Sequence, residues 1–369
     1  MHALTRLSRS SIRRFCTAVL VACVLVAPPV AQAQIFVDAD AGGNDDGTSW
    51  TDAFTDLQDA LNAATGTDEI WIAEGTYKPT GGSDRTVSFT VTGAQDGLGI
   101  FGGFASGETS RDERDPTAHP VVLSGDIGTP DDNSDNSHHV LFFDGTGSGN
   151  ITTATVLDGV TVTRGNAQGT DSNGSGGGND GGGLFCDGDE SFSNECSPTI
   201  ANVIFTDNAA DNDGGAIYND ATDRGTSSPT IVNAIFSGNS AGGKGGAIVN
   251  DSRSNGKSNP AITNAAFIGN SANNGGAIFN NGGFRGASSP TITNATFNGN
   301  SADKKGGAIV NDASGGTNGI SEPTITNVIL SGNSATNDGD EIFNAGSRGT
   351  PTLSHTLIEG GVNGSGVGG

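Results

Sequence analysis

The sequence is poor in basic residues. Lys and Arg number 17 among 369 residues against 41 Asp and Glu, which gives a formal net charge of −24 at pH 7. A chain this acidic repels the phosphates of nucleic acids and the headgroups of anionic membranes, so we exclude both as partners. The carboxylates are spread over loops, which favours a solvated acidic surface suited to a salty medium or to divalent cations over one dedicated site.

Long apolar runs are also absent after residue 33. Before it, four arginines within the first 14 residues precede an apolar run at 18–30, and a small-x-small cleavage pattern stands at 31–33. Residues 1–33 are therefore predicted to be a signal peptide, and no later stretch approaches the roughly 20 apolar residues of a membrane helix. We expect a mature chain that is secreted or held at the cell surface, with no membrane-spanning segment and a net charge of −28, because the signal removes four basic residues and no acidic ones.

Cysteine is scarce as well. Two of the four cysteines lie in the predicted signal peptide, which leaves Cys186 and Cys196 on either side of a nine-residue loop. In an exported chain, one remaining pair at the edges of two predicted strands favours a disulfide that closes this loop. A zinc site is excluded there because two ligands are too few and no histidine lies nearby in the sequence. No phosphate-binding glycine loop and no Ser-His-Asp arrangement is readable either.

What the sequence does have is a unit repeated five times from Ser197 onward. Its successive prolines are 31, 31, 30 and 33 residues apart, which indicates a stacked repeat architecture. Each unit holds two short segments rich in Ile, Val, Phe and Thr, joined by a polar turn, and none has the periodicity of an amphipathic helix. Helical and leucine-rich repeats are thereby excluded, and an all-β parallel β-helix is predicted.

In such a coil each strand pairs with its copy one turn away, at about 4.8 Å, so equivalent residues stack in columns. Burial of each apolar side chain contributes roughly 1.5–3 kcal/mol, and three columns would therefore hold a core that no single unit builds alone. The predicted columns are Ile200, Ile231, Ile262, Ile292 and Ile325; Phe205, Phe236, Phe267, Phe297 and Leu330; and Ile217, Ile248, Ile278, Ile309 and Ile342.

Asparagine recurs at three further positions of the unit. An Asn side chain can adopt the left-handed backbone of a tight corner and donate its amide to the next copy, forming a ladder that satisfies buried polar groups. We interpret these asparagines as structural corners and not as ligands. The predicted ladders are Asn202, Asn233, Asn264, Asn294 and Asn327; Asn208, Asn239, Asn270, Asn300 and Asn333; and Asn219, Asn250, Asn280, Asn311 and Asn344.

Two tetrapeptides of the unit, F-x-x-N and G-G-A-I, resemble the paired repeat motifs of the polymorphic outer membrane proteins, surface β-helices of the pectin-lyase-like group. The first is read from Phe205, Phe236, Phe267 and Phe297, and the second from Gly214, Gly245, Gly275 and Gly306. The fifth unit departs from both motifs. The resemblance covers residues 197–344 and implies a right-handed parallel β-helix associated with the cell surface or outer membrane.

The rest of the chain repeats less cleanly. Residues 34–150 are predicted to form an N-terminal cap and irregular first coils, and residues 151–369 the β-helix repeats, with an incomplete last coil at 345–369. The opening strands also resemble exported bacterial β-helix proteins labelled as probable pectate lyases.

One amphipathic helix is expected in the cap. Phe54, Leu57 and Leu61 stand at helical spacing, with Ser49 or Thr51 available as N-cap. We expect this helix to lie across the open end of the solenoid, where unpaired strand edges would otherwise recruit other chains.

Parallel β-helices also host polysaccharide lyases and hydrolases. Such mechanisms need an acidic cluster that holds calcium beside a basic residue, or carboxylates converging on one bond beside a histidine. The sequence has no Gly-His-Gly, no Arg-x-Lys and no tryptophan-bearing Asp-His segment. We therefore predict no catalytic residues and no cofactor, with calcium as the one candidate ion.

Four polar groupings remain as candidate sites, each with a structural or solubility role as the simpler interpretation. Asp38, Asp40, Asp45 and Asp46 have the oxygen-rich, glycine-spaced pattern of a calcium loop without its full spacing. The others are His138 and His139 with Asp126, Asp131, Asp132 and Asp135; the cluster Arg111, Asp112, Glu113, Arg114 and Asp115; and an edge of Arg224, Arg253, Lys257, Arg285 and Arg348 that would suit an anionic glycan.

The sequence thus predicts an exported or surface-exposed β-helix scaffold for adhesion or interaction, without catalysis, that contacts a glycan or cell-surface partner. The alternative is a polysaccharide lyase or glycoside hydrolase acting on acidic polysaccharide. A third hypothesis is a calcium-stabilised structural protein with no specific partner.

Overall fold

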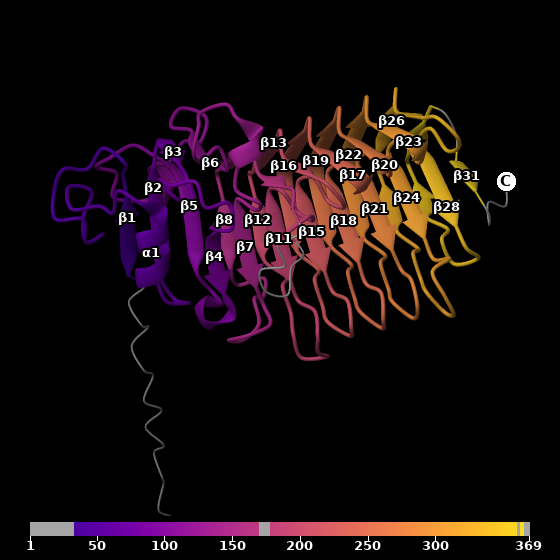
Figure 1. Ribbon diagram of the computed structural model, residues 1–369, viewed down its shortest axis with the longest axis horizontal. Helices are drawn as coiled ribbons and strands as arrows, with labels where there is room; N and C mark the ends of the chain where they lie inside the picture. The colour runs from indigo at the N-terminus through magenta and orange to yellow at the C-terminus, as the bar shows by residue number, and fades with distance from the viewer. Residues whose placement is uncertain (1–32, 170–177, 360–361, 365–369) are drawn as a thin grey trace, which may run out of the picture. The chain divides into compact units, whose positions relative to one another are not determined.

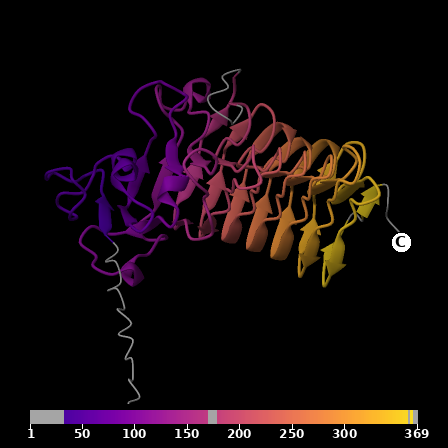
Figure 2. The same cartoon turned by 90° about the horizontal axis from the view of Figure 1, so that it is seen from below.

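The computed structural model describes residues 33–169, 178–359 and 362–364, and the predicted signal peptide lies outside them except for Ala33. The described part is a parallel β-solenoid of about ten turns, in which strands stack turn upon turn (Figures 1 and 2). This confirms the all-β parallel β-helix predicted from the repeat.

The largest sheet has 16 strands and carries the P-T-I-x-N-x-x-F segment of each unit. Its strands are β1 Gln34–Val37, β2 Glu69–Ala73, β3 Gly75–Tyr77, β5 Gly99–Phe104, β6 Val121–Ser124, β8 Val156–Asp158, β9 Thr161–Thr163, β12 Thr199–Ala201, β13 Ile204–Thr206, β16 Thr230–Ser237, β19 Ala261–Ile268, β22 Thr291–Asn298, β25 Thr324–Thr326, β26 Ile329–Ser331, β29 Thr352–Ser354 and β30 Leu357–Ile358.

Two smaller sheets complete each turn. The nine-stranded sheet, which carries the G-G-A-I-x-N segment, consists of β4 Phe89–Thr92, β7 Leu141–Asp144, β11 Leu184–Asp187, β15 Ile217–Asp220, β18 Ile248–Asp251, β21 Ile278–Asn281, β24 Ile309–Asp312, β28 Ile342–Ala345 and β31 Val362–Gly364. The six-stranded sheet between them consists of β10 Asn166–Ala167, β14 Ala209–Ala210, β17 Ser240–Lys244, β20 Ser271–Asn274, β23 Ser301–Lys305 and β27 Ser334–Ala335.

The core consists of the aligned columns. Ile231 pairs with Ile262 and Phe236 with Phe267 across β16 and β19, and the same register continues into β22. All members of the Ile200, Phe205 and Ile217 columns are fully buried. The irregular first coils share this register, because Leu157 pairs with Ile200.

The cap differs in detail from the expected helix. The helix α1 spans Leu57–Ala63, its N-cap is Asp56, and the Asp56 carboxylate accepts from the Gln58 amide at 2.7 Å. Phe54 lies before the helix and forms a β-bridge with Val37. Since Asp56 is the N-cap, the prediction of Ser49 or Thr51 at that position was wrong. The helix stands beside β1 at the end of the solenoid (Figure 1). In the part of the chain that the structure describes, no helix has the length and apolar character to cross a membrane.

The exposed asparagine ladder differs from the two buried ones in backbone and in the direction of donation. Only the exposed ladder that begins at Asn202 has left-handed backbone, with φ of 53–55°, and each side chain donates to the preceding turn, as Asn233 does to Asn202 at 3.1 Å. In the buried ladder of Asn239 the left-handed residue is the preceding Gly238, and donation runs to the following turn, to Asn270 at 2.9 Å. The left-handed asparagines expected at all three corners therefore occur at one.

Candidate functional site

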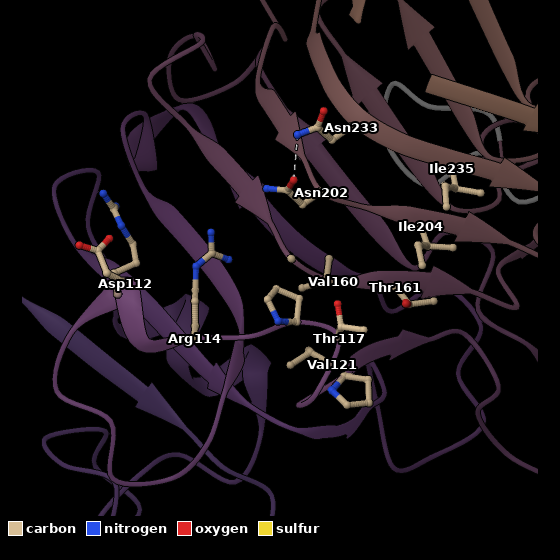
Figure 3. Close-up of a pocket in the computed structure, with 14 residues that line it drawn as sticks. Asp112, Arg114, Thr117, Val121, Val160, Thr161, Asn202, Ile204, Asn233 and Ile235 are labelled. Carbon is tan, nitrogen blue, oxygen red and sulfur yellow. Dashed lines mark hydrogen bonds between the residues drawn. The ribbon is translucent and has the colours of Figure 1, made fainter. Parts of the chain in front are cut away.

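A groove of about 780 Å³ opens on the outer face of the 16-stranded sheet. One wall is the connection between β5 and β6, and the other is formed by outward residues of β9, β13 and β16 (Figure 3). Its lining residues are Arg111, Asp112, Arg114, Pro116, Thr117, Pro120, Val121, Gly159, Val160, Thr161, Asn202, Ile204, Asn233 and Ile235.

Arg114 is held firmly at the base of this groove. Its Nη2 donates to Oδ2 of Asp158 at 2.8 Å and its Nη1 to the carbonyl oxygen of Gly102 at 3.1 Å. Asp158 uses its other oxygen, Oδ1, to accept from Asn202 at 2.8 Å. An unbroken series of contacts thus joins Arg114 to the exposed asparagine ladder, and both Asp158 oxygens are occupied.

Arg111 is the more accessible cation of the groove. It belongs to the short 3-10 turn Arg111–Glu113, which begins at Ser110, whose hydroxyl accepts from the Asp112 amide. Its guanidinium pairs with Glu69 at 2.8 Å and lies over the ring of Phe101 at 4.7 Å, yet its side chain is 48% exposed. The remaining donors of this side chain can therefore reach a ligand.

The sheet side of the groove is partly apolar. Ile204 and Ile235 occupy paired positions on β13 and β16 and are 38% and 40% exposed, since alternate residues of a strand face outward. Asn202 and Asn233, two residues before them in the chain, line the same groove (Figure 3). Exposed branched side chains beside fixed amide and guanidinium groups suit a ligand with an apolar face and several hydroxyl or carboxylate oxygens.

The other candidate acids of the Arg111–Asp115 cluster serve the local turn. Glu113 accepts from the Thr109 and Ser110 amides, which lowers the pKa of its carboxyl. Asp115 likewise accepts from Thr117 and Ala118. Among the described lining residues, Asp112 is the one carboxylate facing the groove.

Three of the four aspartates of the predicted calcium loop accept from separate groups. Asp45 accepts from Thr55, Asp46 from Thr48, and Asp38 from the Asp40 amide and the Ser106 hydroxyl. Across residues 33–169, 178–359 and 362–364, no group of three or more His, Cys, Asp or Glu side chains is placed to hold a metal ion.

The histidine grouping is likewise separated. Asp126 and Asp131 both pair with Arg164. His139 bonds through Nδ1 to the Gly181 carbonyl at 3.0 Å, and withdrawal of its ring from water lowers its pKa to about 4. Asp132 and Asp135 accept from Ser134 and Thr129, in the loop before the histidines.

The basic edge lies in the turns that link the nine-stranded sheet to the next coil. Arg253 pairs with Asp251 at 2.7 Å and Arg348 with Glu322 at 3.7 Å. Arg224 and Arg285 lie over the rings of Phe192 and Phe284. Successive turns are bridged through Thr226, Lys257 and Ala287. These cations therefore share one series of turns, and several are already partnered.

The chain matches the family model of the Chlamydia polymorphic membrane protein repeat at residues 202–220, 233–251 and 294–312. Each matched segment runs from the exposed asparagine ladder to the aspartate that ends a strand of the nine-stranded sheet. The chain is a β-helix with polymorphic membrane protein repeats. No curated protein and no solved structure matches it.

The groove combines this repeat with a segment outside it. Asn202 and Asn233 open two of the matched polymorphic membrane protein repeats, whereas the wall at 111–120 precedes all three. Sequence reasoning placed the arginines in a local cluster and the asparagines in a ladder but missed that the two meet. The signal was indirect, because Asp158, which joins them, stands where the later units have Ala201 or Val232.

Proposed function

We propose that the protein is an exported or surface-exposed scaffold for adhesion and interaction, without catalytic activity, and that the groove is one of its contact surfaces. The polymorphic membrane protein repeats support a place at the cell surface. The solenoid supplies a rigid support, since each turn is fixed to its neighbours by backbone pairing.

The series of contacts from Arg114 through Asp158 to Asn202 carries this proposal. It fixes hydrogen-bond donors along the groove before any ligand arrives, which lowers the entropic cost of binding. It also engages both oxygens of Asp158, so neither is free to contact a bound ligand. Glycoside hydrolysis generally requires two carboxyl groups about 5–9.5 Å apart across the scissile bond, and the described lining offers Asp112 alone.

A glycan is the partner class that the groove suits best. Sugar rings present an apolar face and a hydroxyl edge, which match Ile204 and Ile235 on one side and the Asn202 and Asn233 amides on the other. Arg111 adds a cation that favours a uronic acid carboxylate, because guanidinium binds carboxylate with two parallel hydrogen bonds.

The test is binding of the purified full chain to polygalacturonate, alginate and neutral glycans, measured by biolayer interferometry. Thr117→Trp fills the groove from its exposed wall, and Thr296→Trp places the same bulk on the outer face of β22, away from the groove. We expect at least a tenfold loss of glycan affinity for Thr117→Trp and no change for Thr296→Trp. Equal affinity of both variants would refute the groove as the contact surface.

A polysaccharide lyase is the second candidate, favoured by the half-exposed Arg111 beside Asp112 in the same groove. Incubation of the protein with polygalacturonate and alginate, with and without calcium, separates the two functions. Calcium-dependent release of unsaturated products would establish the lyase and overturn the non-catalytic scaffold.

A further inference from the structure

One column of the nine-stranded sheet is acidic along most of its length. The register aligns Asp144, Asp187, Asp220, Asp251, Asn281 and Asp312, each the last residue of its strand. Neighbouring strands lie about 4.8 Å apart, and like charges directly opposite one another destabilise a sheet. Each carboxylate of the column therefore needs a donor or a cation of its own.

In most turns the residue two positions later supplies that partner. Asp144 accepts from the amide and hydroxyl of Thr146 at 2.9 and 2.7 Å. Asp312 accepts from the amide and hydroxyl of Ser314 at 2.8 and 2.6 Å. Asp251 pairs with Arg253, whose Nη2 lies 2.7 Å from Oδ2.

The turn of Asp187 breaks this pattern, because the residue two positions later is Asp189. Asp187 is fully buried, and its Oδ1 accepts only from the Asp189 amide at 3.3 Å. Asp187 Oδ2 and Asp189 Oδ1 are both buried without a hydrogen-bond partner in the protein, and Asp189 is only 9% exposed. Two unpartnered carboxylate oxygens thus stand within one nine-residue loop closed by the Cys186–Cys196 disulfide.

The surrounding charges do not neutralise this pair. Among the ion pairs of the described residues, none includes Asp187 or Asp189. Burial, followed by the charges of neighbouring acids that include Asp220, raises the pKa of Asp187. Burial, the charge of Asp187 and a hydrogen bond that a protonated Asp189 carboxyl donates to Asp187 raise the pKa of Asp189, so the two carboxyl groups lie against each other. The pair holds its negative charge only at a cost unless a cation is supplied from solution.

We propose that Asp187 and Asp189 bind a calcium ion inside the disulfide-closed loop 187–195. Carboxylate oxygens are the ligands that Ca²⁺ prefers, and Ca²⁺ tolerates an irregular shell completed by water and main-chain oxygens, whereas Mg²⁺ demands an octahedron. The ion takes the place that the guanidinium of Arg253 has beside Asp251. Since two side-chain carboxylates converge and not three, the affinity belongs to the range of about 10⁻⁴–10⁻³ M typical of extracellular calcium modules.

The site is tested by isothermal titration calorimetry of CaCl₂ into the metal-free full chain. Asp189→Asn keeps the shape of the side chain and removes its charge, and Asp45→Asn makes the same change in the loop whose sequence pattern favoured calcium. We expect binding to the unmodified protein, at least a tenfold weaker affinity for Asp189→Asn, and no change for Asp45→Asn. Absence of binding to the unmodified protein, or loss only in Asp45→Asn, overturns the proposal.

Thermal unfolding separates a ligand from a structural role. In EDTA, Asp189→Asn should melt at the same temperature as the unmodified protein or higher, because the substitution removes one of two like charges. Calcium should raise the melting temperature of the unmodified protein and leave that of the variant unchanged, and an equal concentration of Mg²⁺ should have a smaller effect. A variant that is destabilised in EDTA but still gains from calcium would show a structural role and refute the site. The outcome is independent of glycan binding, which Thr117→Trp tests.

Discussion

The phenyl ring of Phe236 stacks on that of Phe267, with centroids 4.8 Å apart and planes inclined by 4°. Phe205 and Phe297 extend the stack on either side with the same near-parallel geometry. Parallel in-register strands impose this arrangement, because identical side chains one turn apart meet at the strand spacing.

Phe267→Ala should lower the free energy of unfolding by about 3–5 kcal/mol, because a fully buried ring is removed and a cavity remains within the stack. Its neighbour Ile268 faces outward and is 46% exposed, so Ile268→Ala is the matched control. Urea unfolding followed by circular dichroism measures both. Similar losses for the two variants would contradict the stacked core.

Asn270→Leu should lower the free energy of unfolding by at least about 3 kcal/mol, since each buried polar group left unpaired costs about 1–3 kcal/mol. The Asn270 amide donates to the Phe236 carbonyl, and its oxygen accepts from Asn239. Asn264→Gly, in the exposed ladder, retains access to left-handed backbone and should change stability much less. The same urea titration measures both variants. An equal loss of unfolding free energy for Asn264→Gly and Asn270→Leu would contradict a larger contribution from the buried ladder.

The disulfide predicted from the two remaining cysteines is present between Cys186 and Cys196. Replacing both by serine should reduce stability by about 2–4 kcal/mol, because the unfolded chain regains the freedom of the closed loop. Differential scanning calorimetry with and without a reductant provides the measurement. A reductant should lower the melting temperature of the unmodified protein and not that of the double variant, and an effect on both would exclude this explanation.

The acidic column should make stability depend on pH. Burial, assisted by the charges of Asp189 and Asp251, raises the pKa of Asp220 to about 7 from an ordinary value of 3.8. Between these pH values the folded state retains a proton that the unfolded chain has lost, so the contribution of this group to stability falls as pH rises from about 4 to 7. Asp220→Asn removes that contribution. In metal-free buffer, the stability difference between variant and unmodified protein should grow in favour of the variant over this interval, and a constant difference would contradict the raised pKa.

Much of the fold can be predicted from the repeat, because the residues of each column recur at equivalent positions of successive units. Ile262 and Phe267 recur at fixed spacing, and the coil register has only one way to align them. The start of the helix in the N-terminal cap could not be predicted in this way, because the helical spacing of Phe54 does not reveal that its backbone pairs with Val37. The helix begins only after Asp56, because the Asp56 side chain accepts from the Gln58 amide and serves as the N-cap.

The groove was beyond sequence reasoning for a similar reason. Arg114 and Asn202 are far apart in the chain, and they meet only because Asp158 lies one turn before the strand that Asn202 follows. The acidic column is predictable from the sequence, since most units end in Asn-Asp after the G-G-A-I motif. The unpartnered carboxylates at Asp187 and Asp189 are not predictable from the sequence, because only the structure shows which donors each carboxylate accepts from.

The opposed directions of amide donation in the asparagine ladders affect the electrostatics of the whole solenoid. The Asn233 and Asn239 side chains belong to the same coil, but their amide-to-amide hydrogen bonds run toward opposite ends of the axis. The third ladder donates in the same direction as that of Asn239, as Asn250 does to Asn280 at 2.8 Å, so one amide dipole per coil is left uncancelled. Each coil that evolution adds to such a rod therefore extends an uncancelled row of amide dipoles along its axis.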